Sequence, residues 1–269
     1  MQNIIIPTPY RLLDIKKMTD LEYLFRVEYP EAEKIQFGQF MQLSLPKVGE
    51  CPISVTDFSV EEGWAEFLIR KVGTVTDEIF NLYPGDLLPM RGPYGKGFDL
   101  KNYVEKKLVI ATGGSGLAPV RSLIKYVHNN PTSVKSMELL FGFKDQDSIL
   151  FEDEIVEWRE NFPMILTVDK GCGLDGECVG LVTEYVPQLK MTEHNFENLE
   201  VVIVGPPMMM KYTALEFLKL GVPEKNIWVS FERKMSCAVG KCGHCRIDET
   251  YVCLEGPVFN YESAKYLID

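Results

Sequence analysis

The cysteines near the end of the chain are the residues whose spacing points most directly to chemistry. Four of the seven cysteines crowd into one short stretch, at Cys237, Cys242, Cys245 and Cys253. The first three follow the plant-type spacing for a 2Fe-2S cluster, whose irons are held by cysteine thiolates. Gly240 and Gly243 lie inside this stretch, where the chain must curl and offer N–H groups to the sulfurs. The stretch therefore predicts a 2Fe-2S site.

A structural zinc site is the main alternative, because it also uses four thiolates. Zinc sites usually have two close cysteine pairs held well apart, whereas three of these cysteines lie within nine positions. A disulfide pair is favoured less than either metal. His244 lies between two of the cysteines, and we interpret it as a loop residue because four thiolates complete the set. Cys51, Cys172 and Cys178 show no comparable spacing, and we expect buried or loop thiols there.

A glycine-rich turn is the second chemical motif, and it follows the apolar strand core 108–111. Its residues are Gly113, Gly114, Ser115, Gly116, Leu117, Ala118 and Pro119. Glycines let the backbone approach a pyrophosphate closely, and N–H groups at the next helix start attract its charge. The alternative is that these glycines only pack the crossover from strand to helix.

A second loop is expected at the same edge of the sheet. It follows the apolar core 201–204 and consists of Gly205, Pro206, Pro207, Met208 and Met209. Open α/β sheets bind ligands in the crevice outside the carboxyl ends of their strands. The two loops together therefore predict a nucleotide site.

Composition and charge limit the class of protein. The 269 residues, 46% hydrophobic and 25% charged, leave room for two ordinary domains and a small appendage. No basic start precedes an apolar core, and no run of about 18 uncharged apolar residues occurs, so we expect a cytoplasmic chain without a membrane span. The net charge of −11 disfavours nucleic acid or an anionic membrane surface as a partner. The odd cysteine count fits a reducing compartment.

The chain changes character near 101–107. Before that point, short alternating segments separated by turns predict an antiparallel β-barrel, with strands at 23–29, 38–45, 53–57, 64–71 and 86–91 and a helix at 76–83. After it, apolar strand cores at 108–111, 137–143, 164–168, 201–204 and 227–231 alternate with helical patterns at 118–128, 152–161, 181–189 and 208–220. That alternation predicts a doubly wound parallel sheet. We expect a barrel domain over 1–102, an α/β domain over 103–230 and a cluster module over 231–269.

These motifs, taken in order, resemble the ferredoxin-reductase-like electron-transfer subunits, and the resemblance covers essentially the whole chain. The cysteine motif and its flanks, from Phe231-Glu232-Arg233 to Glu255-Gly256-Pro257, are its most specific part. Within the family, the chain is most similar to the electron-transfer subunits of anaerobic sulfite reductase. It is less similar to those of dihydroorotate dehydrogenase and sulfhydrogenase.

The resemblance implies an FAD site on the barrel. The matching residues are Cys51, Pro52, Ile53 and Ser54 on one strand, Leu68, Ile69 and Arg70 on another, and Gly73, Thr74, Val75 and Thr76 at a turn and helix start. Ser54 would lie near flavin N5 and Ile53 against the isoalloxazine ring. Cys51 stands where the family carries a phosphate-binding arginine, so a charged clamp is lost there. Arg70 or Lys71 is the expected replacement.

The resemblance also implies a mechanism and partners. NADH would lie across the two loops, FAD would accept its hydride, and a cluster that takes one electron at a time would pass electrons onward. The partners would be an iron–sulfur subunit and the sirohaem subunit that reduces sulfite to sulfide. No catalytic side chain is expected, because the protein positions and tunes its cofactors.

Three questions stay open from the sequence. Acidic residues after two strand cores, at Asp145, Asp147 and Asp169, favour NADH over NADPH. The same modules also suit another oxidoreductase complex, with pyrimidine synthesis as the first candidate. A non-enzymatic assembly subunit with a decayed flavin site and a zinc knot is the remaining alternative, and Cys51 is its only support.

Overall fold

The computed structural model describes residues 5–171, 178–192 and 196–267, and in that part the chain forms two compact units. The first unit comprises the chain up to Phe98 together with 118–122 and 232–257. The second comprises 99–117, 123–231 and the chain from Val258 onward. This division by contacts differs from the expected domain limits, which stay predictions. It groups most of the cysteine-rich segment with the barrel and returns the chain end to the second unit.

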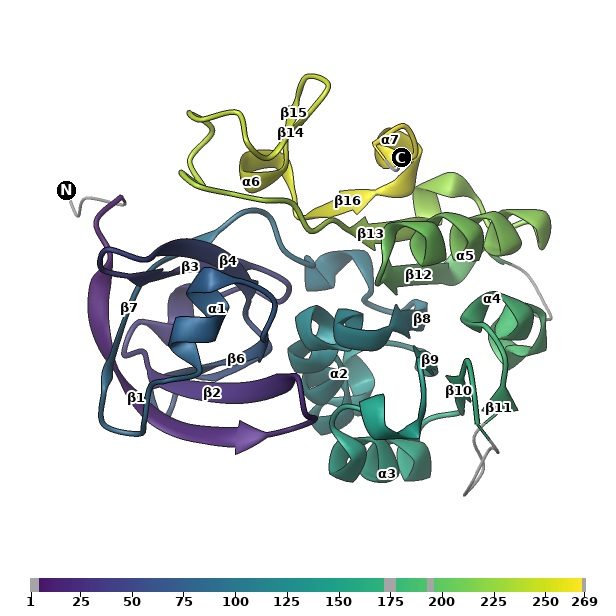
Figure 1. Cartoon of the computed structure of the whole chain (residues 1–269). Helices are drawn as coiled ribbons and strands as arrows, with labels where there is room; N and C mark the ends of the chain where they lie inside the picture. Colours follow the sequence, from purple (N-terminus) through teal and green to yellow (C-terminus); the bar gives the residue numbers. More distant parts are fainter. Residues whose placement is uncertain (1–4, 172–177, 193–195, 268–269) are drawn as a thin grey trace. The chain divides into compact units, whose positions relative to one another are not determined.

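The first unit is built on a seven-stranded sheet in the order β4-β3-β7-β1-β2-β6-β5, and its paired neighbours run antiparallel. The strands are β1 (Thr8–Lys17), β2 (Glu22–Glu28), β3 (Phe40–Leu45), β4 (Gly49–Ser54), β5 (Asp57–Ser59), β6 (Trp64–Arg70) and β7 (Leu87–Tyr94). The sheet curls into a barrel, and the helix α1 (Thr74–Ile79) lies across one opening (Figure 1).

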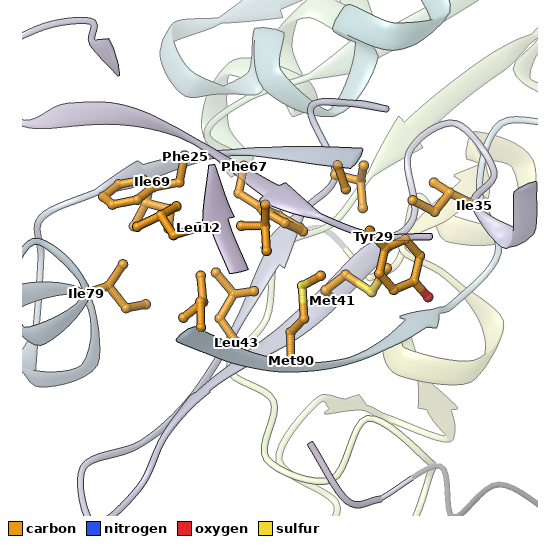
Figure 2. Packing of buried hydrophobic residues seen from close by; sticks show 14 of the residues in the cluster. Leu12, Phe25, Tyr29, Ile35, Met41, Leu43, Phe67, Ile69, Ile79 and Met90 are labelled. Carbon is orange, nitrogen blue, oxygen red and sulfur yellow. The ribbon is translucent and has the colours of Figure 1, made fainter. Parts of the chain in front are cut away.

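Alternating side chains from these strands fill the interior of the barrel. Phe25, Val27, Met41, Leu43 and Phe67 are fully buried there. Figure 2 shows side chains from different strands converging on this core, with Ile79 reaching it from α1. Strands that bury alternate residues form such an interior because successive side chains point to opposite faces. The core fixes where the polar outer faces of the strands lie.

The sequence predicted most of this barrel but missed its first strand. The strand β1 has only one fully buried side chain, Leu12, among ten residues. Charged and exposed residues occupy most of its other positions, so the hydrophobic alternation that identifies a strand is weak. The predicted strand 53–57 is in fact the end of β4 followed by the separate strand β5.

The second unit contains a sheet in the order β11-β10-β9-β8-β12-β13-β16. Its strands are β8 (Lys107–Gly113), β9 (Ser136–Phe143), β10 (Met164–Val168), β11 (Cys178–Val179), β12 (Leu199–Val204), β13 (Ile227–Ser230) and β16 (Val258–Asn260). The first six pair in parallel, as the continuous apolar cores predicted. The edge strand β16 pairs antiparallel with β13 and was not predicted.

Helices cover both faces of this sheet. They are α2 (Ala118–Asn129), α3 (Glu152–Asn161), α4 (Val182–Tyr185), continued by a 3-10 turn at Val186–Gln188, and α5 (Pro207–Lys219). The helix α3 lies on one face, while α4 and α5 pack together on the other (Figure 1). Within the described residues, no helix has the length and hydropathy that crossing a membrane requires. The predicted loop thiol Cys172 lies outside the described residues.

A buried group of charged side chains lies in the first unit. Arg121, in the first turn of α2, donates from Nη1 to Oε2 of Glu66 at 2.6 Å and lies 3.8 Å from Oδ2 of Asp57. Arg26 donates from Nε to the other oxygen of Glu66 at 2.9 Å. Burial alone would raise the pKa of Glu66, but Arg121 and then Arg26 outweigh it and hold that pKa below its ordinary value.

Replacing Glu66 with glutamine should cost about 3 kcal/mol of unfolding free energy at neutral pH, because it removes the charge that Arg121 and Arg26 both contact and leaves only Asp57 as a carboxylate near Arg121. A lowered folded pKa contributes stability that is present above the unfolded value of about 4.3 and is lost as pH falls through the folded value. The gap between wild type and E66Q should therefore shrink below about pH 4. Urea titrations over pH 3–8 measure it. Glu61→Gln, at an exposed carboxylate between β5 and β6, is the control and should change little. A constant gap across this range would contradict the account.

Candidate functional site

The four clustered cysteines lie in a segment of the first unit with little regular structure. Three precede the short strands β14 (Arg246–Ile247) and β15 (Thr250–Tyr251), and Cys253 lies in the four-residue helix α6 (Val252–Glu255). Cys245 and Cys253 are buried, Cys237 is half-buried and Cys242 is exposed. The structure therefore places the predicted cysteines in one loop region, in which two of them are buried and one is exposed.

Backbone N–H groups point at two of the sulfurs. The N–H groups of Val239, Lys241 and Cys242 donate to Sγ of Cys237 at 3.4, 3.2 and 3.3 Å. Gly240 donates to Sγ of Cys253 at 3.3 Å. Positive φ angles at Ala238, Gly240 and Gly243 let the backbone curl in this way. Such donors stabilise thiolate charge, which is what a metal-bound sulfur needs.

The thiols form two neighbouring pairs, in which one thiol affects the ionisation of the other. Cys242 pairs with Cys237, and the backbone N–H of His244 is the main cause that lowers the pKa of Cys242 to about 7. Cys253 pairs with Cys245, and burial raises the pKa of Cys253 to about 12. Among the described residues, no three His, Cys, Asp or Glu side chains converge as ligands of one metal ion would. Two thiol pairs with inward N–H donors fit a two-iron cluster better than zinc.

The two loops predicted to hold a nucleotide lie directly against each other in the second unit. A Cβ on Gly116 would be 2.4 Å from the carbonyl oxygen of Val204, and one on Gly205 would be 3.0 Å from the backbone nitrogen of Gly113. A Cβ on Gly113 would be 3.3 Å from Cδ of Pro206. Glycine is therefore needed at Gly116, and at Gly113 and Gly205 a side chain would fit only with small shifts of its neighbours. Packing is thus part of the role of these glycines, as the alternative interpretation expected, although they pack the two loops on each other rather than the crossover from strand to helix.

Other residues of the same turn have surface that a ligand could reach. Gly114 has a φ of +54°, and no atom lies within 4 Å of the Cβ position it leaves open. Gly114 and Ser115 are half-buried, whereas Ala118 and Pro119 are buried in the start of α2. In the second loop, which follows β12, Pro207 and Met208 are exposed at the start of α5. In the second unit, the accessible surface of the two loops therefore includes Gly114, Ser115, Pro207 and Met208.

Of the residues expected to contact a flavin, those on β4 are half-buried. Cys51 and Ile53 both touch the barrel core, and Pro52 and Ser54 alternate with them. Burial, followed by the charge of Glu50, raises the pKa of Cys51 to about 12. A thiol that stays neutral cannot replace the phosphate-binding charge of an arginine.

The neighbouring expected residues differ in what they can offer. Leu68 is nearly buried and Ile69 is fully buried in the barrel core, so Ile69 could reach a cofactor only through backbone atoms. Arg70 is half exposed and its Nε lies 3.5 Å from Glu22 Oε1, which leaves its guanidinium accessible for a phosphate. This side chain is the better-placed replacement for the missing arginine.

The turn before α1 divides its expected roles between structure and surface. The Thr76 hydroxyl accepts hydrogen bonds from the N–H groups of Val72 and Gly73, each at 3.0 Å, and so closes the turn. Val75 packs against the barrel core. Gly73 and Thr74 are exposed and are the members of this set with free surface for a pyrophosphate.

Sequence reasoning missed Arg91, a buried side chain that touches the cysteine loop. The sequence placed Arg91 only as the last residue of the predicted barrel strand 86–91. Its Nη1 donates to the carbonyl oxygen of Cys237 at 2.8 Å, and its Nη2 donates to that of Ser236 at 2.7 Å. The only available signal was an arginine within a predicted barrel strand, and a strand pattern alone does not show what such a side chain contacts.

The close contact of the two loops in the second unit can be tested with Gly116→Ala. The added methyl group would meet the backbone of Val204, which cannot move aside easily, so the variant should lose about 1–3 kcal/mol of unfolding free energy. Ser115→Ala, which adds no atom, is the control and should stay within about 0.5 kcal/mol of wild type. Urea unfolding of both measures this. Equal stability of the two variants would show that the loops do not pack as described.

Comparison with protein families gives two matches. The oxidoreductase NAD-binding domain matches residues 109–214. The iron–sulfur cluster binding domain of dihydroorotate dehydrogenase B matches residues 232–264. These matches confirm the predicted NAD-binding and iron–sulfur-binding parts of the chain.

Similar proteins span nearly the whole chain. Sulfhydrogenase 1 subunit gamma of Pyrococcus furiosus is 36% identical, covering 93% of this chain and 89% of its own. A probable dihydroorotate dehydrogenase B electron transfer subunit from the same organism is 33% identical, covering 88% and 84%. The solved NADH-dependent reduced ferredoxin-NADP oxidoreductase, from work on flavin-based electron bifurcation, aligns with a TM-score of 0.80 and 26% identity over 95% of this chain and 89% of that one. The predicted fold class is confirmed by this likeness.

Proposed function

Because the chain belongs to the ferredoxin-reductase-like electron-transfer subunits, the family of the sulfhydrogenase gamma and dihydroorotate dehydrogenase B subunits, we propose that it moves electrons from NADH through FAD and a 2Fe-2S cluster to a partner. The observation that carries the proposal is the cysteine loop. Its two thiol pairs and its N–H donors to Cys237 and Cys253 suit a redox cluster.

FAD and the cluster, when bound, supply the conversion of a two-electron hydride into single electrons. The chain's own residues position these groups. The accessible surface of Gly114 and Ser115 would receive the pyrophosphate of the nucleotide through backbone N–H groups. Ser54, Arg70, Gly73 and Thr74 offer hydrogen bonds and charge on the barrel, and Cys237, Cys242, Cys245 and Cys253 hold the irons.

The proposed partner is a catalytic subunit of a redox complex, reached through an iron–sulfur subunit. The resemblance of the whole chain to the electron-transfer subunits of anaerobic sulfite reductase favours the sirohaem subunit that reduces sulfite to sulfide. The likeness to sulfhydrogenase 1 subunit gamma favours a hydrogenase-type partner as the second candidate. Co-purification of the complex from its native source, followed by assays of sulfite, hydrogen and dihydroorotate turnover, distinguishes these acceptors.

Removal of one ligand tests the cluster directly. Cys245→Ser should lose most of its iron, sulfide and visible iron–sulfur absorbance after anaerobic purification, because a buried hydroxyl replaces a thiolate ligand. NADH-driven reduction of a two-electron dye should persist, while reduction of a one-electron protein acceptor should fall at least about tenfold. Cys178→Ser, at a half-buried thiol in β11, is the control and should keep the cluster. Zinc in place of iron, or an unchanged spectrum in Cys245→Ser, would contradict the proposal.

Coenzyme preference follows from carboxylates at the ends of two neighbouring strands. Asp145 and Asp169 follow β9 and β10, and the N–H of Asp169 donates to the carbonyl oxygen of Phe143 at 3.0 Å. Burial, together with the nearby charge of Asp145 and despite Lys170, raises the pKa of Asp169. A ribose hydroxyl can donate to such a carboxylate, whereas a 2′-phosphate is repelled by it.

We expect kcat/KM for NADH to exceed that for NADPH by at least about tenfold, which corresponds to about 1.4 kcal/mol of discrimination. The double variant D145N/D169N should narrow this ratio by about fivefold or more, because the repulsion of the phosphate is removed. Steady-state reduction of a dye by each coenzyme gives the ratio. Glu160→Gln, an exposed carboxylate on α3, should leave it unchanged. A ratio that is the same in D145N/D169N and wild type would rule out these carboxylates as its source.

A further inference from the structure

Arg91 is a buried guanidinium that contacts two separate parts of the first unit. Its side chain, on β7, is 4% exposed, and it forms an ion pair with Glu50 on β4. Its Nη1 also donates to the hydroxyl of Tyr94 at 3.1 Å. The remaining contacts are those with the carbonyl oxygens of Ser236 and Cys237 at 2.7 and 2.8 Å. One side chain thus connects the barrel with the beginning of the cysteine loop.

The end of the cysteine loop meets the same barrel segment. Lys96 donates its N–H to the carbonyl oxygen of Gly256 at 2.5 Å. A Cβ on Gly95 would lie 2.4 Å from that oxygen, so only glycine allows this approach. The loop is therefore attached at both ends to residues 91–96, and Arg91 is the charged member of that attachment.

Cys237 is held through two of its groups. Its carbonyl oxygen accepts from Arg91, while its sulfur accepts from the N–H groups of Val239, Lys241 and Cys242. Hydrogen bonds and charge around cluster sulfurs set the reduction potential of an iron–sulfur cluster. Arg91 therefore affects both the position of Cys237, the first proposed ligand, and the charge around it.

Glu50, the partner of Arg91 in the ion pair, lies next to the proposed flavin site. It directly precedes the β4 residues Cys51 to Ser54, which are proposed to line the flavin. The Nε of Arg91 lies 3.2 Å from each carboxylate oxygen of Glu50. The ion pair therefore lies between the proposed flavin strand and the first proposed cluster ligand, both within the first unit.

Stability alone is a weak explanation for this arrangement. Burying an arginine and a carboxylate costs desolvation energy that their attraction often fails to exceed, and apolar replacements can be equally stable. Lysine would carry the same charge but lacks the planar fork that reaches a carboxylate and two carbonyls together. What needs explanation is why this side chain is a planar guanidinium, and why it donates to the backbone carbonyl of a proposed cluster ligand.

We propose that the Glu50–Arg91 pair is a positioning device for the cluster, with Arg91 fixing the backbone of Cys237 and the balance of the two charges setting the cluster's reduction potential. This inference rests on the proposed function. Reduction of a bound 2Fe-2S cluster by one electron would make it one unit more negative. A nearby cation favours that reduced state and a nearby anion opposes it.

The test is the midpoint potential of the cluster in the full-length chain, followed by electron paramagnetic resonance during a dye-mediated anaerobic titration. Glu50→Gln should raise the potential, because it leaves Arg91 uncompensated while keeping its bonds to the loop. Arg91→Gln should lower it, because Glu50 is left alone. At an effective dielectric of about 20, each shift should be on the order of tenfold in the reduced-to-oxidised ratio, or about 59 mV.

Two further variants separate charge from position. The double variant E50Q/R91Q should return the potential toward that of wild type. Arg91→Lys should recover the potential but not the wild-type resonance line shape, because the bonds to both carbonyls are not restored. Asp20→Asn makes the same charge change at an exposed pair with Lys17 and should leave the potential unchanged.

The outcomes distinguish this inference from the proposed function. A wild-type chain that assembles no iron–sulfur cluster overturns both. A normal cluster whose potential is the same in Glu50→Gln and wild type, or moves in the same direction in Glu50→Gln and Arg91→Gln, overturns the inference alone. If Arg91→Gln fails to fold, Glu50→Gln still decides the matter, because it keeps every hydrogen bond from Arg91 to the loop.

Discussion

A backbone N–H group can donate its hydrogen bond to a carbonyl oxygen of a sheet or to a sulfur, but rarely to both. This constraint shapes the cysteine segment. Between Glu232 and Arg246 the chain forms no strand or helix, and its amides turn toward Cys237 and Cys253. Because these N–H groups donate to sulfur, the segment cannot be stabilised by the hydrogen bonds of a β-sheet. It depends on the barrel instead, through Arg91 at one end and Gly95 with Lys96 at the other.

The glycines of the nucleotide loops show how one residue type serves two purposes. Gly113, Gly116 and Gly205 allow two backbones to touch, and that contact holds both turns at one sheet edge. Gly114 has open space at its missing Cβ position and shows no such close approach. A nucleotide would therefore meet two turns whose mutual contact is already formed, which lowers the ordering cost of binding.

The sequence predicted those features whose signal is local. Cysteine spacing indicated the cluster, glycine and proline marked the nucleotide loops, and apolar runs marked the parallel strands. Features that depend on distant contacts were beyond it. The strand β1 gains its place by pairing with β2 and β7, and β16 by pairing with β13, although neither has a strong pattern of its own. Arg91 is separated from Cys237 by 146 positions, and no periodicity links them. Ile69 and Val75, expected at a cofactor, were found in the barrel core, because their side chains are apolar and packing decides their direction.

The connection between β13 and β16 has an evolutionary meaning. Ser230 and Val258 are direct partners across these antiparallel strands, so the whole run from 231 to 257 leaves and re-enters the sheet at adjacent points. Inserted segments are tolerated best where their two ends already lie close together in the host. The cysteine-rich run is thus an insertion between two paired strands. An ancestor could have gained, exchanged or deleted it in one event without changing the strands on either side.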